Sequence, residues 1–262
     1  MDIQKKLDEI KNLKQNLEKD LLFLIKGKKK IQKGVYFGKN VKVEPNVFFD
    51  ASDGLILIGD NTKIKANSIL RGPLLIGVNC IVNSFTEISC SHIDDICKIG
   101  GEIEHTIMQS YSNKQHHGFL GHSYIGSWIN IGGGTSVSNL KNTYTTIKMG
   151  GVDTGMQFLG CIMGDYVKTA LNTSIFCGKV IGESAHLYGT VTEDVPAFAG
   201  HIRSGVFYEI PLEVAEKIQI AMVKRRNVKW TENDSKNFKK LFKETAKDRK
   251  LAKVKKGKLT FK

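Results

Sequence analysis

The chain has 262 residues, of which 41% are hydrophobic, and its formal net charge is +13. That hydrophobic share can fill a core, so disorder along the whole chain is excluded. The longest apolar run, Leu21 to Ile25, is far shorter than the ~20 residues that a membrane span needs. A charged start and five cysteines without a CxxC pair lead us to expect a cytoplasmic protein with reduced thiols.

The positive charge lies at the two ends of the chain. Residues 1–33 carry +5 and residues 211–262 carry +11, whereas residues 34–210 carry −3. We therefore expect three parts: an N-terminal amphipathic helix with a basic linker (1–33), a middle domain (34–210) and a basic helical segment with a tail (211–262). Because the excess charge lies outside the middle domain, it says little about the chemistry of that domain.

Both ends have the apolar spacing of helices. The N-terminal stripe predicts one helix that ends at Gly27 and packs on the body of the protein. Pro211 predicts a helix over 212–228, and a second helix is expected from Asn233 to about Leu251. We expect the basic residues 250–262 to fray as a solvated tail, with weak polyanion binding as the alternative.

The middle domain repeats an aliphatic residue every six positions. The longest unbroken run consists of Ile58, Ile64, Leu70, Ile76, Val82 and Ile88. A period of six fits neither an amphipathic helix nor an alternating strand. It predicts an all-β domain, a parallel β-helix in which each hexapeptide forms one face of a triangular coil. Helical flanks would cover the ends of the stack.

Polar residues crowd where the repeat is interrupted, in SNKQHHGFLGHSYIGSWINIGGGTSVSNLKN (112–142), which a later MGDYVKTALNTSIFCGKVIG follows. Here the sequence resembles the acetyltransferase half of bifunctional UDP-N-acetylglucosamine diphosphorylase / glucosamine-1-phosphate N-acetyltransferases. The resemblance covers roughly residues 55–200 and is specific in 112–142. It implies a left-handed β-helix, a homotrimer, and acetyl-CoA bound between neighbouring subunits as the acyl donor.

The resemblance also implies roles for individual residues. His116 matches the general base, a role that suits an imidazole because histidine titrates near neutral pH. Glu104, Phe119 and Asn130 match positions that contact the sugar. The N–H of Gly133 matches the donor that stabilises the oxyanion. The remaining matches, to positions near the acetyl group or in the cofactor groove, are Asn139, Thr169, Ala170 and Asn172.

Three departures from the family concern the acceptor. The nucleotidyltransferase half is absent from this chain, so we expect no diphosphorylase activity from it. Glu104 stands where the family has a lysine for the sugar phosphate, and no arginine is found in the expected earlier coil, where Thr86 lies. Phe119 replaces a tyrosine. The expected function is therefore acetyl transfer to an amino sugar phosphate or a nucleotide-linked amino sugar, for cell-envelope precursors.

Two other classes of function remain open from the sequence. His117 and His122 have a spacing that could bind zinc, with His92 or His105 as a third ligand, as in γ-class carbonic anhydrases. The β-helix could instead be a non-catalytic trimeric scaffold whose basic flanks bind a polyanion or a partner. We assign no metal ligand in the preferred reading.

Overall fold

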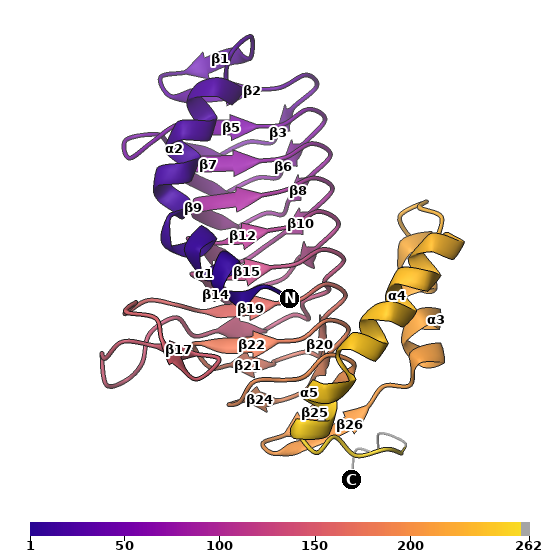
Figure 1. The fold of residues 1–262 in the computed structure, drawn as a ribbon. Coiled ribbons are helices and arrows are strands. Elements are labelled where there is room, and N and C mark those ends of the chain that lie inside the picture. Colours follow the sequence, from indigo (N-terminus) through magenta and orange to yellow (C-terminus); the bar gives the residue numbers. More distant parts are fainter. Residues whose placement is uncertain (258–262) are drawn as a thin grey trace.

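The computed structural model describes residues 1–257 and shows a parallel β-helix of about nine turns, with helices from the N- and C-terminal parts of the chain packed along its sides and not, as predicted from the sequence, over its ends (Figure 1). Three members of the six-residue repeat make one coil, so each member stacks on the third one after it. Ile58 pairs with Ile76, and Ile76 pairs with Ile93 in the next coil. All three side chains are fully buried along the axis. The predicted fold class is confirmed, and it is consistent with the left-handed β-helix that the resemblance implies.

The strands of the coils form three faces. Two faces are named after the helices that cover them, and the third is called the polar face. The N-helix face comprises β2 (Val35–Phe37), β5 (Ile56–Ile58), β12 (Ile107–Met108), β15 (Tyr124–Ile125), β19 (Cys161–Met163), β22 (Lys179–Ile181) and the second halves of β7 (Ile69–Ile76) and β9 (Glu87–Ile93). The α3 face comprises β3 (Lys42–Val43), β6 (Lys63–Ile64), β8 (Ile81–Val82), β10 (Lys98–Ile99), β13 (Asn113–Lys114), β20 (Lys168–Thr169), β23 (His186–Leu187) and β25 (Ala199–Arg203). The polar face comprises β4 (Phe48–Asp50), β11 (Glu102–Glu104), β14 (Phe119–Gly121), β16 (Ser136–Val137), β21 (Ser174–Ile175), β24 (Thr190–Val191) and the first halves of β7 and β9.

Antiparallel hairpins close the stack and interrupt it once. β1 (Lys29–Gln32) pairs with β2 at one end, and β26 (Val206–Glu209) pairs with β25 at the other. These hairpins cover strand edges that would otherwise be open to another chain. A third hairpin, β17 (Lys148–Met149) and β18 (Val152–Asp153), is inserted between β16 and β19. The insertion explains why the six-residue period is lost after Val137.

Five helices flank the β-helix. They are α1 (Ile3–Lys11), α2 (Leu13–Leu24), α3 (Leu212–Lys224), α4 (Glu232–Glu244) and α5 (Ala246–Leu251). The prediction of one N-terminal helix to Gly27 was wrong, because the chain leaves helical geometry at Asn12 and the second helix ends at Leu24. The predicted packing on the body of the protein is seen: Leu17 is buried in a cluster with Leu57 and Ile162 of the N-helix face.

The C-terminal helices are shorter than predicted, and the residues after them are not all frayed. The predicted second helix is divided into α4 and α5 at Thr245. The N–H of Lys255 donates to the carbonyl of Phe207, and the N–H of Glu209 donates to the carbonyl of Lys255. The expectation of a frayed tail was therefore wrong as far as Lys255, and residues 258–262 lie outside the described residues. Among residues 1–257, no helix is long and apolar enough to cross a membrane.

Candidate active site

His116 lies on a turn that joins the α3 face to the polar face. The turn spans residues 115–118, between β13 and β14. Gly118 has a φ of +123°, and a Cβ at this position would lie 2.1 Å from the carbonyl oxygen of Thr135. Only glycine fits this approach of two coils. The turn is thus held against the next coil while the side chains of His116 and His117 remain exposed.

The glycine turn of the next coil lies beside His116. A Cβ on Gly133 would lie 3.4 Å from the Cβ of His116. The N–H of Gly134 donates to the carbonyl of His117 (3.1 Å), which ties the two turns together. Within residues 1–257, the N–H of Gly133 has no hydrogen-bond acceptor. The edge therefore presents an imidazole and a free backbone donor next to each other.

The third coil of this edge supplies the predicted cofactor residues. The N–H of Asn172 donates to the carbonyl of Gly133 (2.8 Å), and Asn172 is exposed. Ala170 is half-buried, and its carbonyl accepts from the hydroxyl of Thr173 (3.0 Å). Thr169 is buried, and its hydroxyl accepts from the N–H of Gly132 (2.9 Å). Thr169 thus supports the glycine turn from inside, whereas Ala170 and Asn172 lie at the surface.

Glu104, Phe119 and Asn139 gather around Gly121, on the polar face. Glu104 pairs with Gly121 across the coils. The position of a Cβ on Gly121 would lie 2.5 Å from the ring of Phe119 and 2.7 Å from the Nδ2 of Asn139. The amide of Asn139 also donates to Nδ1 of His122 (3.0 Å). These three predicted residues therefore lie together on the polar face, which also contains β14, the strand that follows His116.

Asn130 lies on the other side of this edge, on the α3 face. Its backbone bridges Asn113 and Lys168. These residues line a cavity of about 330 Å³ between the α3 face and the C-terminal end of α3. The basic residues of the lining are Lys98, Lys168, Arg225 and Arg226, and among residues 1–257 no acidic side chain lines the cavity.

We call this pocket the cation cavity. Its basic side chains lie close together, and no acidic side chain among its described lining residues offsets their charge. Burial lowers the pKa of Lys168 to about 8. Burial, followed by the charges of Arg226 and Arg225, lowers the pKa of Lys98. Arg226 donates to the side chain of Asn113, and Lys168 donates to Gln219 of α3 (3.0 Å). An anion that entered the cavity would relieve this repulsion.

Sequence reasoning missed the cation cavity. The cavity forms only because α3 folds back over β10, β13 and β20, which lie far earlier in the chain. No short sequence motif indicates such a contact. The signal that could have indicated it is the Arg225-Arg226 pair at the end of a helix expected to pack on the β-helix.

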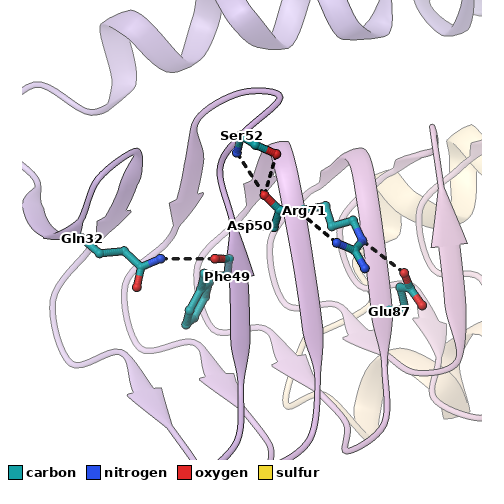
Figure 2. Close-up of polar contacts among 6 residues, drawn as sticks. All are labelled: Gln32, Phe49, Asp50, Ser52, Arg71 and Glu87. Carbon is teal, nitrogen blue, oxygen red and sulfur yellow. Dashed lines mark hydrogen bonds and ion pairs between the residues drawn. The ribbon is translucent and has the colours of Figure 1, made fainter.

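The structure also places an arginine on the polar face. Arg71 pairs in register with Ser89, and Ser89 pairs with Glu104. Figure 2 shows the guanidinium of Arg71 between Asp50 (2.9 Å) and Glu87 (3.2 Å). Arg71 thus lies two coils before Glu104, in the same outward column, with both neighbouring carboxylates already bound to it.

The histidines of the zinc alternative do not gather around one point. Within the described part of the chain, no group of three or more His, Cys, Asp or Glu side chains is placed to hold a metal ion. His122 instead stacks on His105 with 4.6 Å between ring centroids. The Nε2 of His105 faces the backbone carbonyl of Ile10 in α1 (2.9 Å).

Comparisons with known proteins agree with the motif. The chain is 29% identical over 161 residues to the bifunctional protein GlmU of a Nostoc species. This match covers 61% of this chain and 28% of that protein. It is 29% identical over 174 residues to a bifunctional sugar-1-phosphate nucleotidylyltransferase/acetyltransferase of Sulfurisphaera tokodaii, 61% of this chain and 41% of that protein. The predicted resemblance is confirmed. The chain thus spans less than half the length of these relatives.

No family model matches the chain. Among solved structures, a UDP-N-acetylglucosamine acyltransferase of Francisella novicida aligns with a TM-score of 0.46 and 16% identity, over 85% of this chain and 86% of that chain.

Proposed function

We propose that the protein is an acetyl-CoA-dependent N-acetyltransferase whose acceptor is an amino sugar phosphate or a nucleotide-linked amino sugar. The observation that carries the proposal is that His116 lies next to Gly133, whose N–H has no acceptor among residues 1–257, within the segment that resembles the GlmU proteins. An exposed base beside a free backbone donor is the arrangement that acyl transfer to an amine requires.

The chemistry follows from these two groups. The amine nitrogen of the acceptor attacks the thioester carbon, and His116 takes the proton that the nitrogen loses. The N–H of Gly133 donates to the oxygen as it becomes negative. Collapse of the tetrahedral intermediate then breaks the carbon–sulfur bond, and His116 returns its proton to the departing thiolate. The amide product keeps the acetyl group.

The two sides of the edge suit the two substrates. Glu104 on the polar face would attract the ammonium form of an amino sugar, and Phe119 offers an apolar surface beside it. The cation cavity on the α3 face would take phosphate groups, which coenzyme A and nucleotide-linked sugars have in common. A molecule whose phosphates occupy the cation cavity would thus extend onto the edge and bring its reacting group to His116.

The exposure of the edge supports a homotrimer. Phe85 and Leu171 lie on the same edge as His116 and are 76% and 73% exposed. Large apolar side chains that are exposed next to a candidate site are typical of an interface. Packing of three copies along this edge would cover both residues and would enclose His116 between neighbouring subunits.

The release of free thiol from acetyl-CoA tests the proposal. We expect wild-type protein to release coenzyme A with at least one acceptor from a panel of amino sugars, their phosphates and their nucleotide derivatives. His116→Ala should lower the rate by about 100-fold or more, because general-base catalysis contributes that much. His117→Ala removes the neighbouring exposed imidazole and serves as the matched control. Equal rates in both variants would overturn the role of His116.

A further inference from the structure

Lys114 is a buried lysine in a column of aliphatic side chains. It pairs in register with Ile99, which pairs with Val82 in the coil before. Both of these residues are fully buried, and Lys114 is only 2% exposed. Placing an amine in such a column is costly unless the amine is fully hydrogen-bonded. Burial lowers the pKa of Lys114 to about 8, and nearby Glu102 opposes that effect.

The Nζ of Lys114 donates to three backbone carbonyls. The acceptors are those of Gly100 (2.9 Å), His116 (3.1 Å) and Gly118 (2.7 Å). An ammonium group has three N–H donors, so these bonds satisfy it completely and leave none for a ligand. The preceding coil leaves room for the group, because a Cβ on Gly101 would lie 2.9 Å from Nζ. Lys114 therefore acts on the protein itself.

Two of the three acceptors belong to the turn that carries His116. Within residues 1–257, the carbonyls of His116 and Gly100 accept from no other donor, whereas the carbonyl of Gly118 also accepts from the N–H of Glu102 (3.2 Å). The imidazole of His116 has no hydrogen-bond partner among these residues. Its direction is thus fixed only through the backbone of its own turn.

We propose that Lys114 is a positioning residue for His116. Its ammonium group binds the turn 116–118 from inside the β-helix and so sets the direction in which the imidazole of His116 points from the edge. The inference rests on the proposed role of His116 as the base. It assigns to Lys114 no contact with either substrate.

The first test is amide hydrogen exchange in the Lys114→Met and Lys114→Gln variants. The reporting amides are those of Glu102, Phe119 and Gly134, whose hydrogen bonds bracket the turn. Methionine has no donor, so exchange at these amides should rise about tenfold or more. Glutamine can donate two hydrogen bonds and should restore part of the protection. Wild-type exchange in Lys114→Met would overturn the proposal.

Ile99→Met is the matched control, because it places the same methionine side chain in the same column one coil earlier without removing a hydrogen-bond donor. It should leave exchange at the turn unchanged. If it raises exchange as much as Lys114→Met does, the effect comes from repacking and the proposal fails.

The second test separates positioning from general stability. In Lys114→Met, kcat should fall about tenfold or more while KM for acetyl-CoA stays within about twofold, because the base is misdirected and the donor site is intact. Lys114→Gln should recover part of kcat. Faster exchange with an unchanged kcat would overturn positioning. If wild-type protein acetylates no acceptor, the proposed function fails, and exchange alone then decides whether Lys114 holds the turn.

Discussion

His122 illustrates how this fold treats a polar side chain at the level of one residue. Its ring lies between those of His105 and Phe158, with centroid distances of 4.6 and 5.5 Å. Burial, and to a smaller extent the charge of His105, lowers its pKa to about 4. The neutral ring then accepts a hydrogen bond from Asn139 at Nδ1. Protonation of His122 would break that bond and place a charge in a stacked, half-buried site.

We predict that acid destabilises the protein through this residue. Because the folded pKa of about 4 lies below the ordinary value of 6.5, the unfolded chain binds more protons between these pH values. The free energy of unfolding should therefore fall as the pH falls from 6.5 towards 4. His186, whose pKa is also lowered to about 4 by burial, adds to the effect.

Urea unfolding at several pH values between 4 and 7.5 measures this dependence. His122→Asn should show a smaller loss of stability over this range than wild-type protein, whereas His117→Asn, at an exposed position, should match wild type. A His122→Asn variant with the full wild-type pH dependence would contradict the assignment.

At the level of elements, α3 turns one face of the β-helix into a binding cavity. Lys168 donates to Gln219 of α3, and the amide of Gln219 donates to the hydroxyl of Ser184 (3.3 Å). These bonds fix the helix on the face, and Arg225 follows its last turn directly. Arg225 is exposed, and its side chain forms no hydrogen bond or ion pair within residues 1–257. It is thus free to bind an anion.

We predict that Arg225→Gln weakens the binding of phosphorylated ligands. The dissociation constant of coenzyme A, of UDP, or of both should rise about tenfold, because a charge-assisted hydrogen bond to phosphate is lost. Isothermal titration calorimetry with each ligand measures this and shows which of them uses the cavity. Lys217→Gln, an exposed position on α3 that does not line the cavity, is the control. Unchanged affinity for both ligands would exclude the cavity as their phosphate site.

The elements also show what could be predicted from the sequence. The coils were predictable because each hexapeptide places one aliphatic residue, such as Ile58 or Ile76, on the axis by local geometry alone. The turn of His116 and the glycine turn at Gly133 were predictable because they lie one coil apart within one motif. The role of Lys114 could not be predicted, because only the closed coil shows three carbonyls converging on its amine.

At the level of the whole molecule, helices lie over two faces of the β-helix (Figure 1), and His116 is exposed on the edge between the α3 face and the polar face. The charge distribution fits this division, because residues 34–210 carry −3 and the basic flanks lie outside the β-helix coils. An open edge with Phe85 and Leu171 exposed is suited to another copy of the chain.

We predict that the protein sediments as a trimer of the 29.2 kDa chain. Phe85→Glu should dissociate the trimer, because a carboxylate cannot be buried unpaired in an apolar contact. Phe23→Glu is the control, since Phe23 is 73% exposed but lies on α2. Analytical ultracentrifugation of the three proteins tests this. A monomeric wild type would contradict the prediction, as would a Phe85→Glu variant that stays trimeric.

A crystal structure of the protein with coenzyme A bound tests the central claim most directly. The proposal predicts that the sulfur atom lies on the edge between His116 and the N–H of Gly133, within reach of both. It would be contradicted by a coenzyme A molecule whose sulfur atom lies on the N-helix face or at another edge, away from His116.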